Sequence, residues 1–211
     1  MMSVTVLRFL LVLGIIGHAV NMYCDRIISI FPNGRLKIED IKTIGEEGKM
    51  AKLMEGVSEK VPMRSAVWGA YSLVLQFFGY FAITAYIYRK SKIYGSVMFA
   101  AIVMFITVGA AHHVKTALME YVFLHMEKDA RAKDMMVALY NSETATTKCY
   151  IGYLVYVFAL IIAIATGTAA VPVWAVIFTV LPIFIAMFPF RIIGTLHIAA
   201  MVTMLAWIFL V

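Results

Sequence analysis

Three histidines occupy similar places within separate apolar segments of the chain. His18 lies in the first segment, His113 in the third and His197 in the last. If these segments cross a membrane in alternation, the three side chains fall at similar depth in the same half of the bilayer. Polar side chains are unfavourable in hydrocarbon, and those found there usually pair with one another or serve a function. The histidines are therefore the first candidates for a site that moves protons or binds a ligand.

Carboxylates accompany two of these histidines at the same spacing. His18, Asn21 and Asp25 are separated by three and four residues, which places them on one face of a helix. His113 and Glu120 repeat the outer spacing, so each carboxylate lies about 10 Å along a helix axis from its histidine. Imidazole and carboxylate groups are common in acid–base catalysis. We predict that the catalytic residues are His18, His113, His197, Asp25 and Glu120.

The same three histidines are candidate metal ligands. Neutral imidazole suits both zinc and iron, and an open coordination position would admit a water molecule for hydrolysis. The chain has no H-E-x-x-H motif or comparable close pair, so this interpretation of His18, His113 and His197 depends on inferred depth alone. Alternatively, the histidines form hydrogen bonds between helices and only hold the bundle together. The sequence leaves both interpretations open.

Several neighbouring residues could bind a substrate. Arg64 and Arg191 lie at the ends of apolar segments, where a guanidinium could hold a phosphate or carboxylate in bidentate fashion, although such charges also set membrane topology. Tyr80 and Tyr153 could line a pocket for a lipid or serve as packing residues. The predicted substrate-binding residues are Arg64, Arg191, His112, Asn21, Tyr80 and Tyr153.

The composition indicates a membrane protein with several crossings. Of the 211 residues, 63% are hydrophobic and 14% are charged, whereas about a quarter of the residues in soluble domains are charged. Six apolar segments are each close to the roughly 20 residues that a helix needs to cross a bilayer. They cover residues 4–24, 66–88, 94–116 or beyond, 149–168, 171–188 and 191–211. We predict an all-α polytopic membrane helical bundle of about six transmembrane helices, forming a single domain over residues 1–211.

With six crossings, both termini lie on one side of the membrane, which we call side A. The two long loops, residues 26–65 and 125–148, then lie on the opposite side, side B. Amphipathic segments at about 31–61 and 127–141 are expected to lie along the interface and to cap the bundle. Side B is therefore the more elaborate face.

Prolines lie within and just after the fifth apolar segment, at positions 172, 182 and 189. Proline lacks an N–H group and clashes with the preceding helical turn, so we predict a kink or break there. A fixed kink and a moving hinge are both compatible with this pattern.

Charge and cysteine content narrow the classes of partner and chemistry. The formal net charge is +6, but the basic residues are spread over loops that also hold most of the acids. This distribution favours a membrane surface over nucleic acid as the partner. The two cysteines, Cys24 and Cys149, form no C-x-x-C pair and are expected to be packing residues.

Three short motifs flank the apolar segments. They are Met22-Tyr23-x-Asp25, Glu55-Gly56-Val57 with Pro62 and Arg64, and Pro189-Phe190-Arg191. These motifs resemble those of an uncharacterised family of small bacterial six-pass membrane proteins, a domain of unknown function. The resemblance covers most of the chain and implies a multi-pass protein of the bacterial inner membrane, but it supplies no activity.

The histidine cluster is also similar in kind to that of membrane hydrolases related to alkaline ceramidases and adiponectin receptors. Those proteins use histidines, an aspartate and a serine around zinc within seven helices. This chain departs from their pattern, because His197 stands alone in the last segment and six crossings are evident. The comparison therefore illustrates a chemistry and does not indicate membership.

These observations lead to three functional hypotheses. The first is an integral membrane protein with an intramembrane histidine and carboxylate cavity open to side B, acting as an enzyme or binding protein on a membrane lipid or other amphiphile. The enzyme would be a metal-dependent membrane hydrolase or a lipid-modifying enzyme. The second is a small transporter or channel that uses the same polar groups, and the third is a structural membrane subunit. A path reaching both faces would favour transport.

Overall fold

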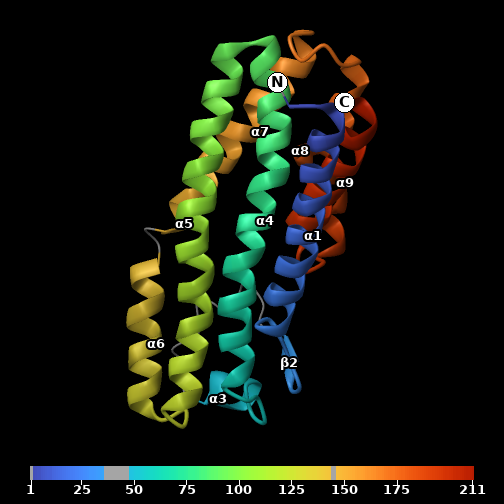
Figure 1. Ribbon diagram of the computed structural model, residues 1–211. Coiled ribbons are helices and arrows are strands. Elements are labelled where there is room, and N and C mark those ends of the chain that lie inside the picture. The colour runs from blue at the N-terminus through green and yellow to red at the C-terminus, as the bar shows by residue number, and fades with distance from the viewer. Residues whose placement is uncertain (1, 36–47, 144–145) are drawn as a thin grey trace.

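The computed structural model describes residues 2–35, 48–143 and 146–211, and it shows an all-α bundle with one small hairpin (Figure 1). The main helices are α1 (Val4–Ile27), α4 (Lys60–Lys90), α5 (Lys92–His125), α7 (Cys149–Ala165) and α9 (Thr195–Leu210). The shorter elements are β1 (Ile30–Phe31), β2 (Gly34–Arg35), α3 (Lys49–Leu53), α6 (Ala130–Glu143), η1 (Thr146–Lys148), η2 (Val173–Phe178), α8 (Val180–Met187) and η3 (Phe188–Phe190). The predicted all-α fold is confirmed.

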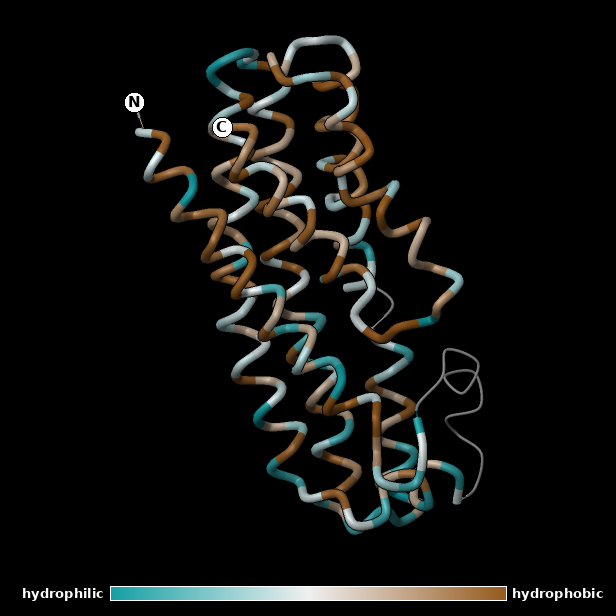
Figure 2. Tube along the Cα trace, turned by 90° about the vertical axis from the view of Figure 1, so that its right-hand side faces the viewer, coloured by the Kyte–Doolittle hydropathy of each residue, from teal (hydrophilic) through white to brown (hydrophobic). Residues whose placement is uncertain are grey.

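The two ends of the bundle differ as the sequence predicts. Both termini lie at one end, side A, together with the connections from α4 to α5 and from α7 to η2 (Figure 1). The hairpin, α3 and the turn between α5 and α6 lie at the opposite end, side B. Hydrophilic residues concentrate toward side B, while hydrophobic residues dominate the remainder of the bundle (Figure 2). The α4 and α5 helices therefore extend on side B beyond the most apolar part of the molecule.

Four helical stretches are long and apolar enough to cross a membrane. They are Val4–Ile27, Lys60–Lys90, Lys92–His125 and Ala130–Ala165, the last of which covers α6 and α7. The apolar stretches Val180–Phe190 and Thr195–Leu210 are shorter. The 16 residues of α9 rise about 24 Å, which is less than the roughly 30 Å of a hydrocarbon core. The apolar helical bundle is thus established, whereas the count of six crossings stays a prediction.

The fifth apolar segment is broken, as its prolines predict. The short helix η2 follows Pro172, and Thr179 is then extended with a ψ angle of 161° before α8 begins. Pro182 falls in the first turn of α8, where its missing N–H removes no intrahelical hydrogen bond. At the end of the segment, Arg191 adopts a left-handed conformation with a φ angle of 50°. The chain then enters α9, against which α8 packs.

Glycines allow α1 and α4 to approach each other closely. A Cβ atom at Gly14 would lie 2.6 Å from the Cα atom of Gly79 and 2.6 Å from the sulfur of Met204. A Cβ atom at Gly17 would lie 2.6 Å from the backbone nitrogen of Gln76. No side chain fits at such distances, so this crossing depends on residues without one. It fixes the position of the histidine that follows Gly17.

A second apolar cluster forms the cap at side B. It joins the hairpin, α3, α5 and α6 through the buried side chains of Phe31, Met50, Met54, Met119, Phe123, Ala132 and Met136. The amphipathic helix predicted near 127–141 is α6, which buries Ala132 and Met136 and exposes Met135. Within the amphipathic region predicted at about 31–61, the structure contains the hairpin and α3, while residues 36–47 lie outside the described part of the chain.

The close crossing of α1 and α4 can be tested by filling it. We expect Gly14→Val to lower the free energy of unfolding by about 1–3 kcal/mol or more, because the new methyl groups overlap the α4 backbone. Denaturant titration of the purified protein in detergent micelles measures this change. Ala19→Val is the matched control, because Ala19 is exposed on the same helix. Equal stability of the two variants would show that the helices do not cross at the glycine.

Candidate functional site

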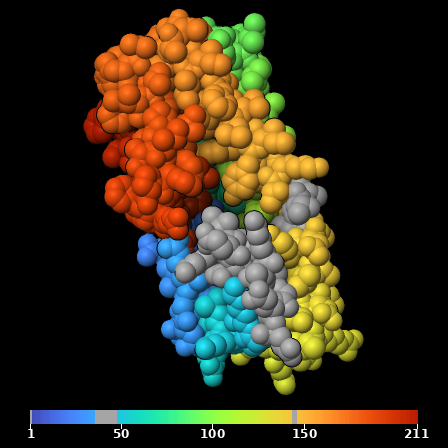
Figure 3. Space-filling model, turned by 180° about the vertical axis from the view of Figure 1, so that it is seen from behind, coloured from blue at the N-terminus to red at the C-terminus, as the bar shows by residue number. Residues whose placement is uncertain are grey.

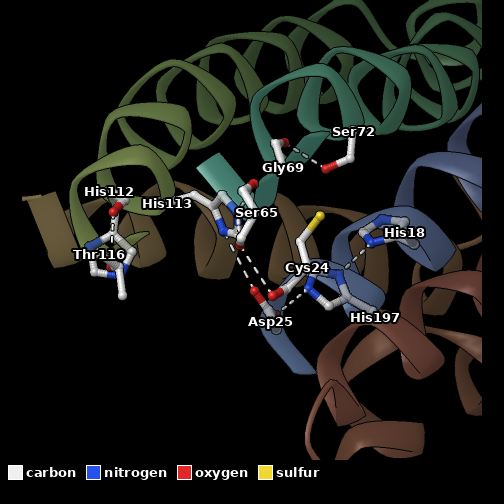
Figure 4. A network of polar contacts seen from close by, with 10 residues as sticks. All are labelled: His18, Cys24, Asp25, Ser65, Gly69, Ser72, His112, His113, Thr116 and His197. Carbon is white, nitrogen blue, oxygen red and sulfur yellow. Dashed lines mark hydrogen bonds and ion pairs between the residues drawn. The ribbon is translucent and has the colours of Figure 1, made fainter. Parts of the chain in front are cut away.

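Two of the three predicted histidines, His113 and His197, contact the carboxylate of Asp25, and the third, His18, contacts His197 (Figure 4). The Nε2 atom of His197 lies 3.0 Å from Asp25 Oδ2, and the Nδ1 atom of His113 lies 3.5 Å from Asp25 Oδ1. The second ring nitrogen of His197, Nδ1, lies 2.9 Å from Nδ1 of His18. We call these four residues the Asp25 network. It connects α1, α5 and α9, three helices that are far apart in sequence.

The contacts of the Asp25 network determine where its protons lie. The Nε2 atom of His113 is 3.1 Å from the carbonyl oxygen of Ser65, so this nitrogen must donate. Its Nδ1 atom faces the carboxylate, and a proton is needed between them. In His197, Nε2 donates to Asp25, which leaves Nδ1 to accept a hydrogen bond from His18. A single proton therefore lies between His113 Nδ1 and the Asp25 carboxylate, bound to one or the other of the two groups.

Small residues of α4 form the seat of the His113 ring. A Cβ atom at Gly69 would overlap the imidazole of His113, so the ring lies directly on the α4 backbone. The Ser65 hydroxyl is 3.4 Å from His113 Nε2 and donates a hydrogen bond to the carbonyl oxygen of Cys24 at 3.1 Å. Ser65 thereby connects the seat to α1. The orientation of His113 is set by α4 as well as by Asp25.

Three members of the Asp25 network, namely Asp25, His113 and His197, line a cavity of about 670 Å³. The side chain of Asp25 is 32% exposed, whereas those of His113 and His197 are about one-tenth exposed. The carboxylate is thus the most accessible member of the network. Polar residues that line the cavity are Asn21, Asp25, Ser29, Arg35, Gln76, His112, His113, Thr116, Tyr150, Arg191, Thr195 and His197. Leu73, Phe105, Phe184, Phe188 and several isoleucines supply apolar walls.

Two arginines lie at the rim of this cavity. Arg35 and Arg191 both line it and are exposed, and the Arg35 guanidinium donates a hydrogen bond of 2.8 Å to the carbonyl oxygen of Arg191. Within the described part of the chain, neither guanidinium forms an ion pair with a carboxylate. Figure 3 shows a hollow on the molecular surface between α8 and the first residues of α7. An anionic group entering there would meet both cations.

The substrate-binding residues predicted from the sequence fall into two groups. Asn21, His112 and Arg191 line the cavity as expected. Tyr80 and Tyr153 do not line it, because their hydroxyl groups pair with each other at 2.8 Å inside the apolar core. Arg64 is exposed on α4 and also lies away from the cavity lining. The structure places the first group at the cavity and the other three residues away from it, and a role in binding stays a prediction.

Glu120 does not join the Asp25 network, although its spacing from His113 repeats that of Asp25 from His18. Its side chain is buried on α5, its Oε2 atom has no hydrogen-bond partner in the described part of the chain, and it does not line the cavity. The seven residues that separate it from His113 place it about 10 Å nearer to side B. The carboxylate partner of His113 is Asp25. His113 contacts Asp25 directly, so these two side chains lie at the same level of the bundle.

The arrangement of the histidines does not support the predicted zinc or iron ion. Metal ligation requires lone pairs that converge on one point at about 2.0–2.1 Å. Instead, one nitrogen of His197 faces His18 and the other faces Asp25, so the rings form a chain. Among the residues that the structure describes, no group of three or more histidine, cysteine, aspartate or glutamate side chains could hold a metal ion.

Sequence reasoning missed several residues of the site. Gly69 and Ser65 seat His113, Gln76 lines the cavity, and Arg35 lies at its rim. A signal for the first two was present, because Ser65, Gly69 and Ser72 form a stripe of small residues typical of close helix packing. Arg35 belongs to a loop hairpin without helical periodicity, so no pattern connected it with the histidines.

A comparison with protein families identifies the chain's relatives. Residues 1–210 match a family of unknown function, DUF6796. The chain belongs to this family. The match agrees with the resemblance to an uncharacterised domain family found in the sequence. No curated protein and no solved structure matches the chain, so the site of this DUF6796 member is interpreted from its own geometry.

The close contact between Gly69 and the His113 ring leads to a steric prediction. We expect Gly69→Ala to displace the imidazole from both Asp25 and Ser65, because the new methyl group overlaps the ring. The nitrogen chemical shifts of labelled histidine in micelles should change for His113, and stability should fall by about 1–3 kcal/mol. Gly109→Ala is the control, because a Cβ atom there meets nothing within 4 Å. Unchanged His113 signals in Gly69→Ala would contradict the close contact.

Proposed function

We propose that this protein is a multi-pass membrane enzyme, formed as one domain, that uses the Asp25 network for proton transfer to or from an amphiphile bound in the cavity. Because the sequence motifs resemble those of a family of bacterial inner-membrane proteins, we also propose that the enzyme lies in that membrane. The observation that carries it is the position of the Asp25 carboxylate, which faces two imidazoles and is open to a cavity of about 670 Å³.

Asp25 is the reacting group in this proposal. Both nitrogens of His197 and both nitrogens of His113 are occupied by other contacts, whereas the carboxylate is 32% exposed. Asp25 accepts a proton from the bound substrate or from an attacking water, and the proton shared with His113 is available to a leaving group. His197 and His18 are positioning residues, because they fix the carboxylate and extend the hydrogen-bonded chain. General acid–base catalysis of this kind contributes about 10²–10⁴-fold to a rate.

The walls of the cavity favour an amphiphile as the substrate. Arg35 and Arg191 at the rim can hold a phosphate or carboxylate in bidentate fashion. Phe105, Phe184 and Phe188 offer apolar surface for a hydrocarbon chain. The opening between α7 and α8 (Figure 3) lies beside an apolar outer surface, so a membrane lipid could enter sideways.

Replacing the carboxylate tests the proposed chemistry. The Asp25→Asn variant, purified from membranes, should retain an amphiphile that the wild-type protein converts, because binding remains while the proton acceptor is lost. Mass spectrometry of retained lipids identifies this compound. When it is supplied in micelles, we expect wild-type turnover to exceed that of Asp25→Asn by about 10²–10⁴-fold.

Glu59→Gln is the matched control, because Glu59 is an exposed carboxylate that also pairs with a histidine, His125, outside the cavity. It should turn over substrate like the wild-type protein. If wild type, Asp25→Asn and Glu59→Gln retain the same lipids and convert none of them, the enzymatic proposal is wrong. That result would favour a structural membrane subunit.

A small transporter or channel is the second candidate. The broken segment formed by η2 and α8, beside a chain of ionisable groups, is a feature of transporters. The region between His18 and side A argues against it, because Leu7, Leu11, Ile83 and Met204 are packed there in the apolar core. Among the described residues, the cavity lining does not extend past this layer.

Reconstitution distinguishes these two candidates. Liposomes that contain the protein and a trapped pH dye should acidify no faster than empty liposomes under a potassium diffusion potential. The physical reason is the apolar layer between His18 and side A. Proton flux that is present in wild type and lost in Asp25→Asn would establish transport instead of catalysis.

A further inference from the structure

Two buried amide side chains at the inner end of the cavity have polar atoms without partners. Gln76 is fully buried, and within the described part of the chain neither its Nε2 nor its Oε1 atom has a hydrogen-bond partner. Asn21 is 5% exposed, and its Oδ1 atom also lacks a partner there. Both residues line the cavity. Buried polar groups are nearly always hydrogen-bonded, so an occupant of the cavity is the natural partner for these atoms.

The position of these amides relates them to the reacting carboxylate. Asn21 precedes Asp25 by one helical turn on α1, which is about 6 Å along the axis. Gln76 lies across from it on α4, where the backbone approaches Gly17. The cavity therefore has charged guanidinium groups at its rim, the Asp25 carboxylate on its wall and uncharged amides at its inner end. A ligand that fills it must present a different group to each zone.

We propose that Asn21 and Gln76 form a recess that binds an uncharged hydrogen-bonding group of the amphiphile, a hydroxyl or an amide. This inference rests on the proposed function and specifies its substrate class. The primary amide of Gln76 offers a nitrogen with two N–H donors and an acceptor oxygen, and Asn21 adds an acceptor oxygen, so the matching group both donates and accepts. An ionic group in the recess would lose its hydration without gaining an opposite charge from either amide. The anionic group of the ligand belongs at Arg35 and Arg191.

Gly109 provides a way to close the cavity without disturbing its walls. It lines the cavity, and a Cβ atom added there would meet nothing within 4 Å. A large side chain at this position therefore extends into empty space instead of into packed neighbours. Gly109→Trp should therefore abolish binding of any occupant.

Matched ligands isolate the contribution of the recess. The first pair is lauroyl glycerol phosphate and lauroyl propanediol phosphate, which differ only in one free hydroxyl group. The second pair is N-lauroyl ethanolamine phosphate and the ester of the same length, which differ only in the amide N–H. Binding of each compound to the chain in detergent micelles is measured by native mass spectrometry, with inorganic phosphate as a control for the rim alone.

We expect at least one hydroxyl or amide compound to bind about tenfold more tightly than its partner, which corresponds to one or two hydrogen bonds. In Gln76→Leu this preference should fall, because only the Asn21 oxygen remains in the recess, while affinity for the weaker compound of each pair stays the same. Gln76 has no protein partner in the described part of the chain, so the variant leaves no other group unpaired. Its melting temperature verifies folding. Arg191→Gln should weaken all four compounds equally and keep the preference.

The outcomes separate this inference from the proposed function. If the compounds bind, Gly109→Trp prevents binding and no pair shows a preference, the recess holds only water and the inference is overturned while the cavity remains a binding site. A preference of unchanged size in Gln76→Leu overturns it as well. If Gly109→Trp binds all four compounds as wild type does, the cavity is not the site, and both proposals fail.

Discussion

The contact between the Asp25 carboxylate and two imidazoles is the interaction on which the site depends. Asp25 lies in the last turns of α1, His113 in the middle of α5 and His197 near the start of α9, so one side chain joins three separate helices. A carboxylate in an apolar bundle requires compensation of its charge, and the proton shared with His113 supplies it. Because both ring nitrogens of His113 and of His197 then have a defined partner, the network also fixes the rotation of α5 and α9 relative to α1.

The network can form only because side chains are absent at particular positions. Gly14, Gly17 and Gly79 bring α1 against α4, and Gly69 gives the His113 ring direct access to the α4 backbone. Gly109 has the opposite surroundings, because open space lies where its side chain would be. Glycine therefore permits close packing in one part of the bundle and preserves an opening in another, where substitution by a larger residue would fill the cavity.

Depth and helical spacing predicted much of this arrangement but could not select the partner of each histidine. Alternating crossings placed His18, His113 and His197 in one half of the bundle, and the structure brings them together. The spacing rule treated Asp25 and Glu120 alike, yet α1 ends two residues after Asp25, whereas α5 continues five residues past Glu120 toward the side B cap. The positions of α1 and α5 along each other, which periodicity does not encode, place Asp25 and not Glu120 beside His113. Ser65 and Arg35 depend on tertiary packing in the same way.

The asymmetry of the bundle explains why the proposed reaction would take place at one side only. Between His18 and side A, the core is closed by apolar residues and by the paired hydroxyl groups of Tyr80 and Tyr153. Toward side B, the break before α8 leaves that helix resting on α9, and the cavity opens between α8 and α7. A helix continuous through Thr179 would extend the α-helical hydrogen-bond ladder across this position and change the direction in which α8 leaves η2. The prolines of the fifth segment thus contribute to the site without any polar side chain, because they favour the break beside its entrance.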